Sequence, residues 1–343
     1  MCTKNSRQST KATYLAKTTG LIALAGVIVM LNACGGGGNG EPAPGEGPGN
    51  GTGGGGAGND QQRMSEIILD FDNNGQMDAR ITYSYFADGR LSAETYEYVG
   101  DGTPDIYNPY YNGSNTDRVD VTYSYDGVGN LTGVTFYQNN GTNVGDYAYT
   151  FNGTDLVQVD ITDTTPVVTT FLLGQLIYQN GLPSQYDISL NGITQVSFNY
   201  QYNGNNQITQ EVRTFTGSNN PQTRTFTWNA DGSIDTITIV DNFTTNMEAF
   251  TYNNGLLVRR DFTFSNPPTN SNNTNVSWLY YYANGVPTGG EYDLNMDGTI
   301  DGTLTVTMEN GPCTPVYFNI VDEITQAGID GLPGSPNGIV WCG

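Results

Sequence analysis

From residue 65 onwards, hydrophobic and polar residues alternate with a period of two, in short runs that are separated by Asn-Gly, Asp-Gly or Gly-Asn pairs. A period of two places every second side chain on the same face of a β-strand, and Asn-Gly or Asp-Gly between two such runs is typical of a hairpin turn. The pattern therefore predicts a succession of short β-hairpins.

A single unit recurs along this region. In its best copy, Tyr123-Ser-Tyr125-Asp-Gly-Val-Gly129-Asn-Leu131, two aromatic residues two positions apart are followed by a turn and an aliphatic residue. The second aromatic residue marks the copies at positions 85, 125, 151, 178, 202, 228, 252 and 282. The first interval is long because residues 99–116 form an inserted loop. A single hairpin cannot bury its apolar face alone, so the units have to pair or stack with one another.

This unit resembles the YD repeat of the Rhs and teneurin families, and the resemblance covers about residues 81–290. In large members of these families, the repeats spiral into a closed shell around a passenger. The present chain has about eight units and lacks the protease-like core and toxin tail of those proteins. We therefore expect an all-β fold, an antiparallel meander of repeated β-hairpins that forms a curled sheet or a partial barrel. The tyrosines are expected to pack along the sheet, with a stacking surface for a sugar or polymer as the alternative.

The N-terminal region has the pattern of an export signal. Residues 1–20 carry four positive charges, and Leu21–Leu31 is an unbroken apolar run. Eleven residues give about 16 Å of helix, roughly half of a 30 Å hydrocarbon core, so the run is too short to span a membrane. The sequence Leu31-Asn32-Ala33-Cys34 resembles the bacterial lipobox, which implies lipidation at Cys34. The alternative is an ordinary signal peptide followed by an incidental cysteine.

The next segment is a tether. Residues 35–58 contain 14 glycines in 24 positions, too few side chains to build a core. Such a chain is flexible and has an r.m.s. span of about 25–30 Å. Gly35 stands where an inner-membrane retention signal carries Asp, so the resemblance implies an outer-membrane lipoprotein, periplasmic or surface-exposed. The predicted organisation is a signal peptide (1–33), a lipidated Cys and tether (34–64), a β-hairpin domain (65–310) and a C-terminal segment (311–343).

Cysteine usage agrees with export. Cys2 leaves with the signal peptide and Cys34 is consumed by lipid, so Cys313 and Cys342 remain as one pair in an oxidising compartment. We predict a disulfide between them that closes the C-terminal segment, worth about 3–4 kcal/mol on the loop-entropy model. Two unpaired thiols are the alternative.

Composition excludes several classes of function. The formal net charge is −22, and removal of residues 1–33 leaves 8 basic residues, all Arg, against 34 acidic ones. A nucleic-acid binder has to neutralise phosphates, so that class is excluded. The chain contains no histidine, which excludes Ser-His-Asp triads and His-ligated metals. No phosphate-binding or nucleophile motif is present either, so we expect a non-enzymatic protein.

Two acidic segments match each other across the domain, Asp70-Phe-Asp72-Asn-Asn74-Gly75 and Asp293-Leu-Asn295-Met-Asp297-Gly298, each followed by an Asp three residues later. Oxygen ligands at alternate positions before a Gly suit a Ca²⁺ ion, and both segments resemble EF-hand-like and thrombospondin type 3 calcium loops. They depart at the twelfth position, where Ile81 and Leu304 stand in β-patterned runs. The candidate ligands are Asp70, Asp72, Asn74, Gln76, Asp78, Asp293, Asn295, Asp297, Thr299 and Asp301. Plain Asp/Asn-Gly turns are the alternative.

Three functions are compatible with these features. The first is a lipid-anchored envelope protein with a rigid β-repeat body that acts in adhesion or envelope interaction, with an extracellular polymer or a protein as partner. The second is a small shell that holds a peptide or toxin partner, which the resemblance alone suggests. The third is a carbohydrate-active protein, for which no paired-carboxylate motif is recognisable.

The anchor can be tested directly. Replacing Cys34 with Ser removes the thiol that the lipid would modify, so the variant should lose incorporation of a palmitate analogue and should leave the membrane fraction. If the variant is still labelled and stays with the membrane, Cys34 is not the anchor.

Overall fold

The computed structural model describes residues 62–70, 72–98, 118–138, 141–153, 155–164, 169–241, 244–265 and 275–313. Cys34, Cys342, the tether and the 99–116 insertion lie outside these residues. Eighteen strands make up the described fold: β1 (Gln62–Asp70), β2 (Ala79–Tyr85), β3 (Leu91–Tyr98), β4 (Arg118–Tyr125), β5 (Leu131–Gln138), β6 (Asn143–Asn152), β7 (Asp155–Thr164), β8 (Thr169–Gln179), β9 (Leu182–Leu190), β10 (Ile193–Tyr202), β11 (Ile208–Phe215), β12 (Gln222–Trp228), β13 (Ile234–Val240), β14 (Thr245–Asn253), β15 (Leu256–Phe264), β16 (Val276–Ala283), β17 (Val286–Leu294) and β18 (Gly302–Asn310).

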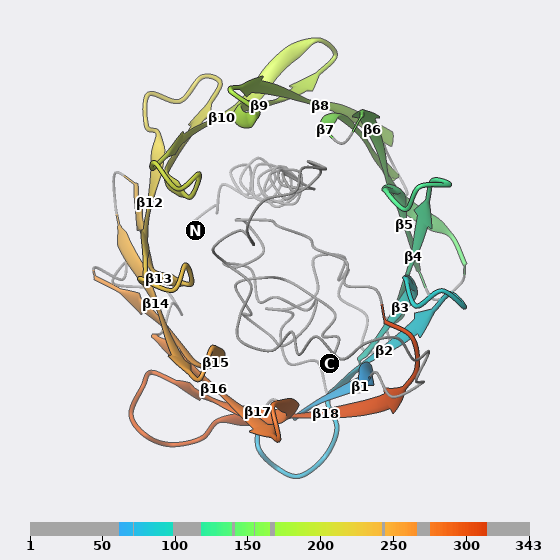
Figure 1. The fold of residues 1–343 in the computed structure, drawn as a ribbon, viewed down its shortest axis with the longest axis vertical. Helices are drawn as coiled ribbons and strands as arrows, with labels where there is room; N and C mark the ends of the chain where they lie inside the picture. Colours follow the sequence, from blue (N-terminus) through green and yellow to red (C-terminus); the bar gives the residue numbers. More distant parts are fainter. Residues whose placement is uncertain are drawn as a thin grey trace, which may run out of the picture.

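The strands form one closed barrel, which Figure 1 shows as a ring. Each strand pairs antiparallel with its neighbour in sequence, and β18 pairs with β1 over eight residue pairs, from Gln62↔Asn310 to Asp70↔Thr303. The predicted all-β antiparallel meander is confirmed. The sheet goes further than a partial barrel, because the pairing of β18 with β1 leaves no free edge.

The turns have the chemistry that the sequence indicates. Four two-residue turns consist of Asn-Gly pairs in which both residues have positive φ, as type I′ hairpin turns require. These pairs are Asn180-Gly181, Asn191-Gly192, Asn254-Gly255 and Asn284-Gly285.

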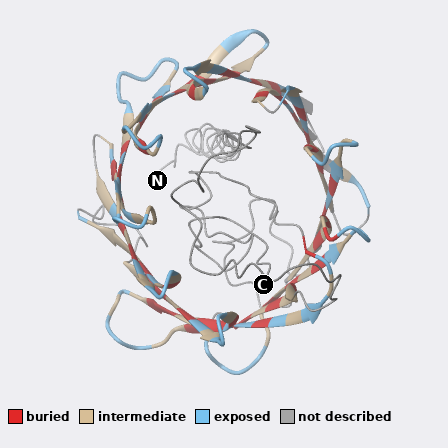
Figure 2. Cartoon of the chain, viewed as in Figure 1, coloured by how far each residue is buried: buried red, intermediate tan, exposed pale blue. Residues whose placement is uncertain are grey.

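The two faces of the wall differ in polarity. On β12, Arg224 and Phe226 are buried whereas Thr225 and Thr227 are exposed. Buried and exposed residues alternate along the strands around the ring (Figure 2). The buried apolar side chains form one cluster. Side chains on the convex face of a single-layer wall point into solvent, while those on the concave face converge. The buried face is therefore the inner wall of the barrel.

The eight hairpins that the aromatic markers identify share one irregularity. The second aromatic residue of each predicted unit lies at or one residue before the end of the first strand, and a β-bulge falls beside it. For example, Ser84 pairs with Ala93 but Tyr85 pairs with Leu91, so Ser92 is the extra residue. A bulge interrupts the ladder locally and increases the twist. The aromatic marker thus identifies where each of these eight hairpins bends.

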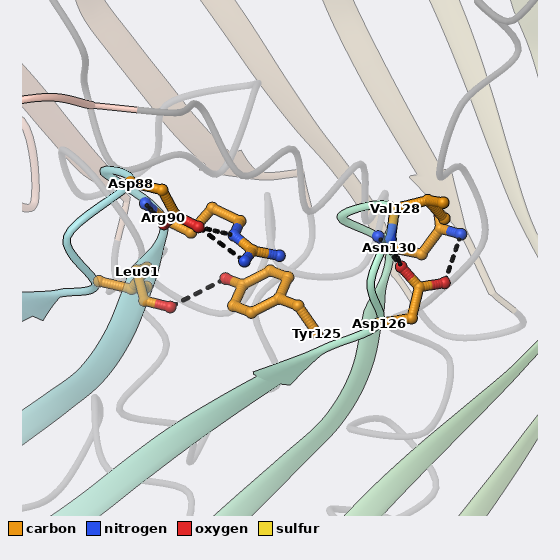
Figure 3. Close-up of polar contacts among 7 residues, drawn as sticks. All are labelled: Asp88, Arg90, Leu91, Tyr125, Asp126, Val128 and Asn130. Atoms are coloured by element: carbon orange, nitrogen blue, oxygen red, sulfur yellow. Dashed lines mark hydrogen bonds and ion pairs between the residues drawn. The ribbon is translucent and has the colours of Figure 1, made fainter.

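A hydrogen bond at this bend joins six of the eight units to the unit before them. Tyr125 donates its hydroxyl to the carbonyl oxygen of Leu91 at 2.9 Å (Figure 3), and Leu91 is the residue that pairs with Tyr85, the marker of the unit before. The same bond, which we call the clamp, recurs in Tyr85→Met64, Tyr178→Leu156, Tyr202→Pro183, Trp228→Ile208 and Tyr282→Leu257. Burial raises the pKa of the Tyr178 and Tyr282 hydroxyls to about 12, so both remain protonated donors at neutral pH.

The clamp is not made by every marker. Phe151 has no hydroxyl group, and the Tyr252 hydroxyl is buried without a hydrogen-bond partner.

The difference between Tyr202, which makes the clamp, and Tyr252, which does not, provides a matched pair of variants. Replacing Tyr202 with Phe should lower the free energy of unfolding by about 1–1.5 kcal/mol, because the Pro183 carbonyl loses its donor. Replacing Tyr252 with Phe should leave stability unchanged or raise it. Urea denaturation of both variants measures the difference, and equal losses would refute the clamp as a stabilising bond.

Candidate functional site

Closure of the barrel brings the two acidic segments to the same rim. Residues 71–78 connect β1 to β2, residues 295–301 connect β17 to β18, and β1 pairs with both β2 and β18. The Asn73 side-chain amide donates to the carbonyl oxygen of Ile300 at 3.3 Å and so joins the two loops. Segments that lie more than 200 residues apart in the sequence are therefore neighbours.

The two loops have the same internal geometry. Asp70 accepts the backbone N–H groups of Asn74 and Gly75 at 3.1 and 2.7 Å. Asp293 accepts those of Asp297 and Gly298 at 3.1 and 2.8 Å. Both aspartates are 8% exposed. The sequence match between the loops is thus a match in three dimensions.

The side chain four residues after the first aspartate of each loop also accepts a backbone N–H. Asn74 accepts the N–H of Gln76 at 2.7 Å, and Asp297 accepts the N–H of Thr299 at 2.8 Å. The second bond holds the pKa of the Asp297 carboxyl below its usual value. Gln76 and Thr299 therefore contribute N–H groups to the fold of their loops.

The first loop has the better arrangement for a metal ion. Asp70, Asp72 and Asp78 each offer one carboxylate oxygen within 4.8 Å of the others, which fits the oxygen-rich shell of a hard cation such as Ca²⁺. In the second loop, a carboxylate oxygen of Asp301 accepts the Leu294 N–H at 2.6 Å, and the Asn295 N–H donates to Asn275 at 2.6 Å. Among the described residues, the first loop is the stronger calcium candidate.

The inner wall contains a feature that sequence reasoning missed, a polar sector of five buried charged residues. They are Glu211 and Arg213 on β11, Arg224 on β12, Glu248 on β14 and Arg260 on β15, none more than 7% exposed. A Glu211 oxygen lies 3.6 Å from Arg213 and 3.7 Å from Arg224, and Glu248 accepts two hydrogen bonds from Arg260 at 2.9 and 3.2 Å. Desolvation raises the pKa of Glu248, and Arg260 and Arg224 oppose that shift.

Several polar atoms around this sector lack hydrogen-bond partners. Gln222 Oε1, Asn246 Oδ1, Glu248 Oε1 and the Tyr252 hydroxyl are buried and make no hydrogen bond. Leaving a buried acceptor unsatisfied costs about 1–3 kcal/mol. Aligning the repeats by position could have revealed the sector, because Glu211 and Arg260 stand three residues after the aliphatic residue that pairs with the aromatic marker. Val134 and Val159 stand at this position in other units.

The described residues do not test the predicted lipidation or the predicted disulfide. Cys34 and Cys342 are not among them, and Cys313 is buried with 8% exposure. Both remain predictions. Within the described part of the chain, no helix is long and apolar enough to cross a membrane.

No family model matches the sequence, and no curated protein matches it either. Among solved structures, the barrel is similar to a porin-like protein from Bacteroides uniformis, with a TM-score of 0.38 and 12% identity over 72% of this chain and 96% of that one. A porin-like protein from Bacteroides vulgatus gives a TM-score of 0.34 and 8% identity over 71% and 97%. A TcdB2-TccC3 structure without its hypervariable C-terminal region gives 0.26 and 12%, over 70% of this chain and 14% of that chain. With TM-scores below 0.5, these likenesses carry no argument about function.

Proposed function

We propose that the chain is a tethered cell-envelope lipoprotein whose body is a calcium-stabilised ring of β-hairpins, and that it acts in adhesion or envelope interaction. The observation that carries this proposal is the polarity of the two faces. Outward positions such as Thr225 and Thr227 are exposed and polar, and most apolar side chains of the strands belong to the buried cluster, with scattered exceptions such as Phe171 and Ile193. A transmembrane barrel needs an apolar outward band, so a body with this wall stands in water at the end of the predicted tether.

The proposed role is one of binding rather than catalysis. The chain has no histidine, and the exposed wall presents a mainly polar surface, with single apolar side chains such as Phe171 and Ile177, to an extracellular polymer or protein partner. Lipidation at Cys34 would hold this surface at the outer membrane, within about 25–30 Å of the bilayer by the length of the tether.

Calcium is proposed as the ion that fixes the two acidic loops. Without metal, the carboxylates of Asp70, Asp72 and Asp78 lie close together in a strongly acidic protein and repel one another. A bound cation relieves that repulsion beside the β1–β18 pairing. Saturating Ca²⁺ at 100 times its dissociation constant would add about 2.7 kcal/mol per site, or roughly 5–10 °C in melting temperature for a domain of this size.

Calorimetric melting of the mature protein in Ca²⁺ and in EDTA tests this proposal. The wild-type protein should melt at a higher temperature in Ca²⁺, and Mg²⁺ should have a smaller effect because it demands octahedral geometry. Asp72→Ala combined with Asp297→Ala should abolish the difference. Asp160→Ala, which removes an exposed carboxylate from β7, is the matched control and should retain it. Identical melting of the wild type in Ca²⁺ and EDTA would reject calcium.

A second candidate is favoured by the inner wall. A shell that holds a peptide needs an apolar surface with a few polar groups that fix the peptide's position. The polar sector provides guanidinium donors, and the buried oxygens of Gln222, Asn246 and Glu248 can accept peptide N–H groups. Recovery of a co-purifying peptide by mass spectrometry of the denatured protein would favour this candidate over adhesion.

A further inference from the structure

The pairing of β18 with β1 builds a ninth hairpin unit from the two ends of the described chain. In the other eight units, the two strands are consecutive in the sequence. Here Met308 takes the position of the aromatic marker and pairs with Met64. Thr307 pairs with Glu66, so Ser65 is the extra residue of a bulge that falls where the other eight bulges fall.

We call the β18–β1 pairing the seam, and its side-chain hydrogen bonds repeat those of the other units. The hydroxyl of Ser65 donates to the carbonyl oxygen of Thr307 at 3.1 Å. In the β8–β9 hairpin, the corresponding bond joins Ser184 to Ile177 at the same distance. The β18–β1 pair is therefore a unit of the same kind as the others.

The β2–β3 unit also makes the clamp to the seam, as other units do to the unit before them. Tyr85 donates to the Met64 carbonyl at 2.5 Å, and the Arg63 guanidinium lies over the Tyr85 ring at 4.1 Å. One unit further on, Tyr125 donates to Leu91 and Arg90 lies over the Tyr125 ring at 4.7 Å (Figure 3). The stacked arginine and the clamp thus form a motif that occurs at the seam and again beside it.

One property sets the seam apart, because no turn connects its strands. The strand ends are held by side chains instead. Arg63 contacts Glu309 at 2.7 Å and donates to the Pro312 carbonyl at 2.9 Å. Pro312 in turn lies against the β2–β3 turn, where a Cβ on Gly89 would come within 2.5 Å of its backbone. Met308 lacks the hydroxyl that would clamp β18 to the β16–β17 unit.

We propose that this seam is a latch, the joint at which the ring opens and gives access to the apolar inner wall. Each of the other hairpins closes through a short turn, whereas the seam closes a loop of more than 200 residues, and the entropic cost of closure grows with loop length. Proteins open locally in cooperative units, and among the nine units only the seam has no turn that keeps its two strands together once their pairing is broken. Opening at the seam exposes Ile67 of β1 and Leu304 of β18, which are almost fully buried in the closed ring. The inference depends on strand pairing and not on calcium or on the adhesion role.

Hydrogen exchange followed by mass spectrometry on the mature protein tests the latch. Peptides from β1 and β18 should exchange together, at least about tenfold faster than peptides from β10–β11. Arg63→Gln should accelerate exchange in both seam strands and increase binding of the apolar dye ANS. Arg259→Gln is the matched control, because Arg259 is a more exposed arginine paired with Asp261 on β15, and it should leave the seam unchanged.

A second variant keeps the proposal falsifiable if Arg63→Gln fails to fold. Met64→Cys combined with Met308→Cys places two thiols at directly paired positions of the seam. Oxidation should slow exchange in β1 and β18 to the rate of β10–β11, and reduction should restore the faster rate. If the two seam strands of the wild type exchange as slowly as β10–β11, or independently of each other, the latch is wrong.

Discussion

The clamp is the interaction on which the rest of this structure depends. A tyrosine or tryptophan that is mostly buried has to find an acceptor for its polar hydrogen. Here the acceptor is a carbonyl that directly precedes the extra residue of the preceding unit's bulge, as Leu91 precedes Ser92. Because six of the eight markers make this bond to the unit before them, it sets how most successive hairpins follow one another. Nine hairpin units, with the β18–β1 pairing as the ninth, return the chain to its start.

Closure has consequences that no single hairpin could produce. It removes both edges of the sheet, which would otherwise present unpaired backbone groups to other chains. It also places the loops that follow β1 and β17 side by side, where Asn73 contacts Ile300. The two calcium-like segments are thus parts of one rim. The first of these loops follows β1, and β1 is also one strand of the seam, so the metal site proposed there and the stability of the seam are physically linked.

Much of this architecture could be predicted from the sequence because its signals are local. The aromatic markers identify eight hairpins, and Asn-Gly pairs form the turns of three of them. A type I′ turn and a two-residue period depend on neighbouring residues alone. The ninth hairpin could not be recognised in the same way, because Val306 and Met308 replace the aromatic pair and the return strand lies at the other end of the chain. The polar sector was missed for a different reason. Glu211 and Glu248 follow a period-two pattern in which charged residues normally mark the exposed face, and only the register of the repeats reveals that they point inwards.

A circular permutant tests the central claim, that the barrel is a ring of nine equivalent hairpin units. Joining Gly311 directly to Arg63 creates the sequence Met308-Glu-Asn310-Gly311-Arg63-Met64, which has the same spacing as Tyr252-Asn-Asn254-Gly255-Leu256-Leu257. The chain is then opened between Asn254 and Gly255. If the seam is an ordinary unit, the permutant should be monomeric, with an unchanged β-sheet circular dichroism spectrum and a melting temperature within a few degrees of the parent protein. A permutant that fails to fold, while the unpermuted chain of residues 63–311 folds normally, would contradict the claim.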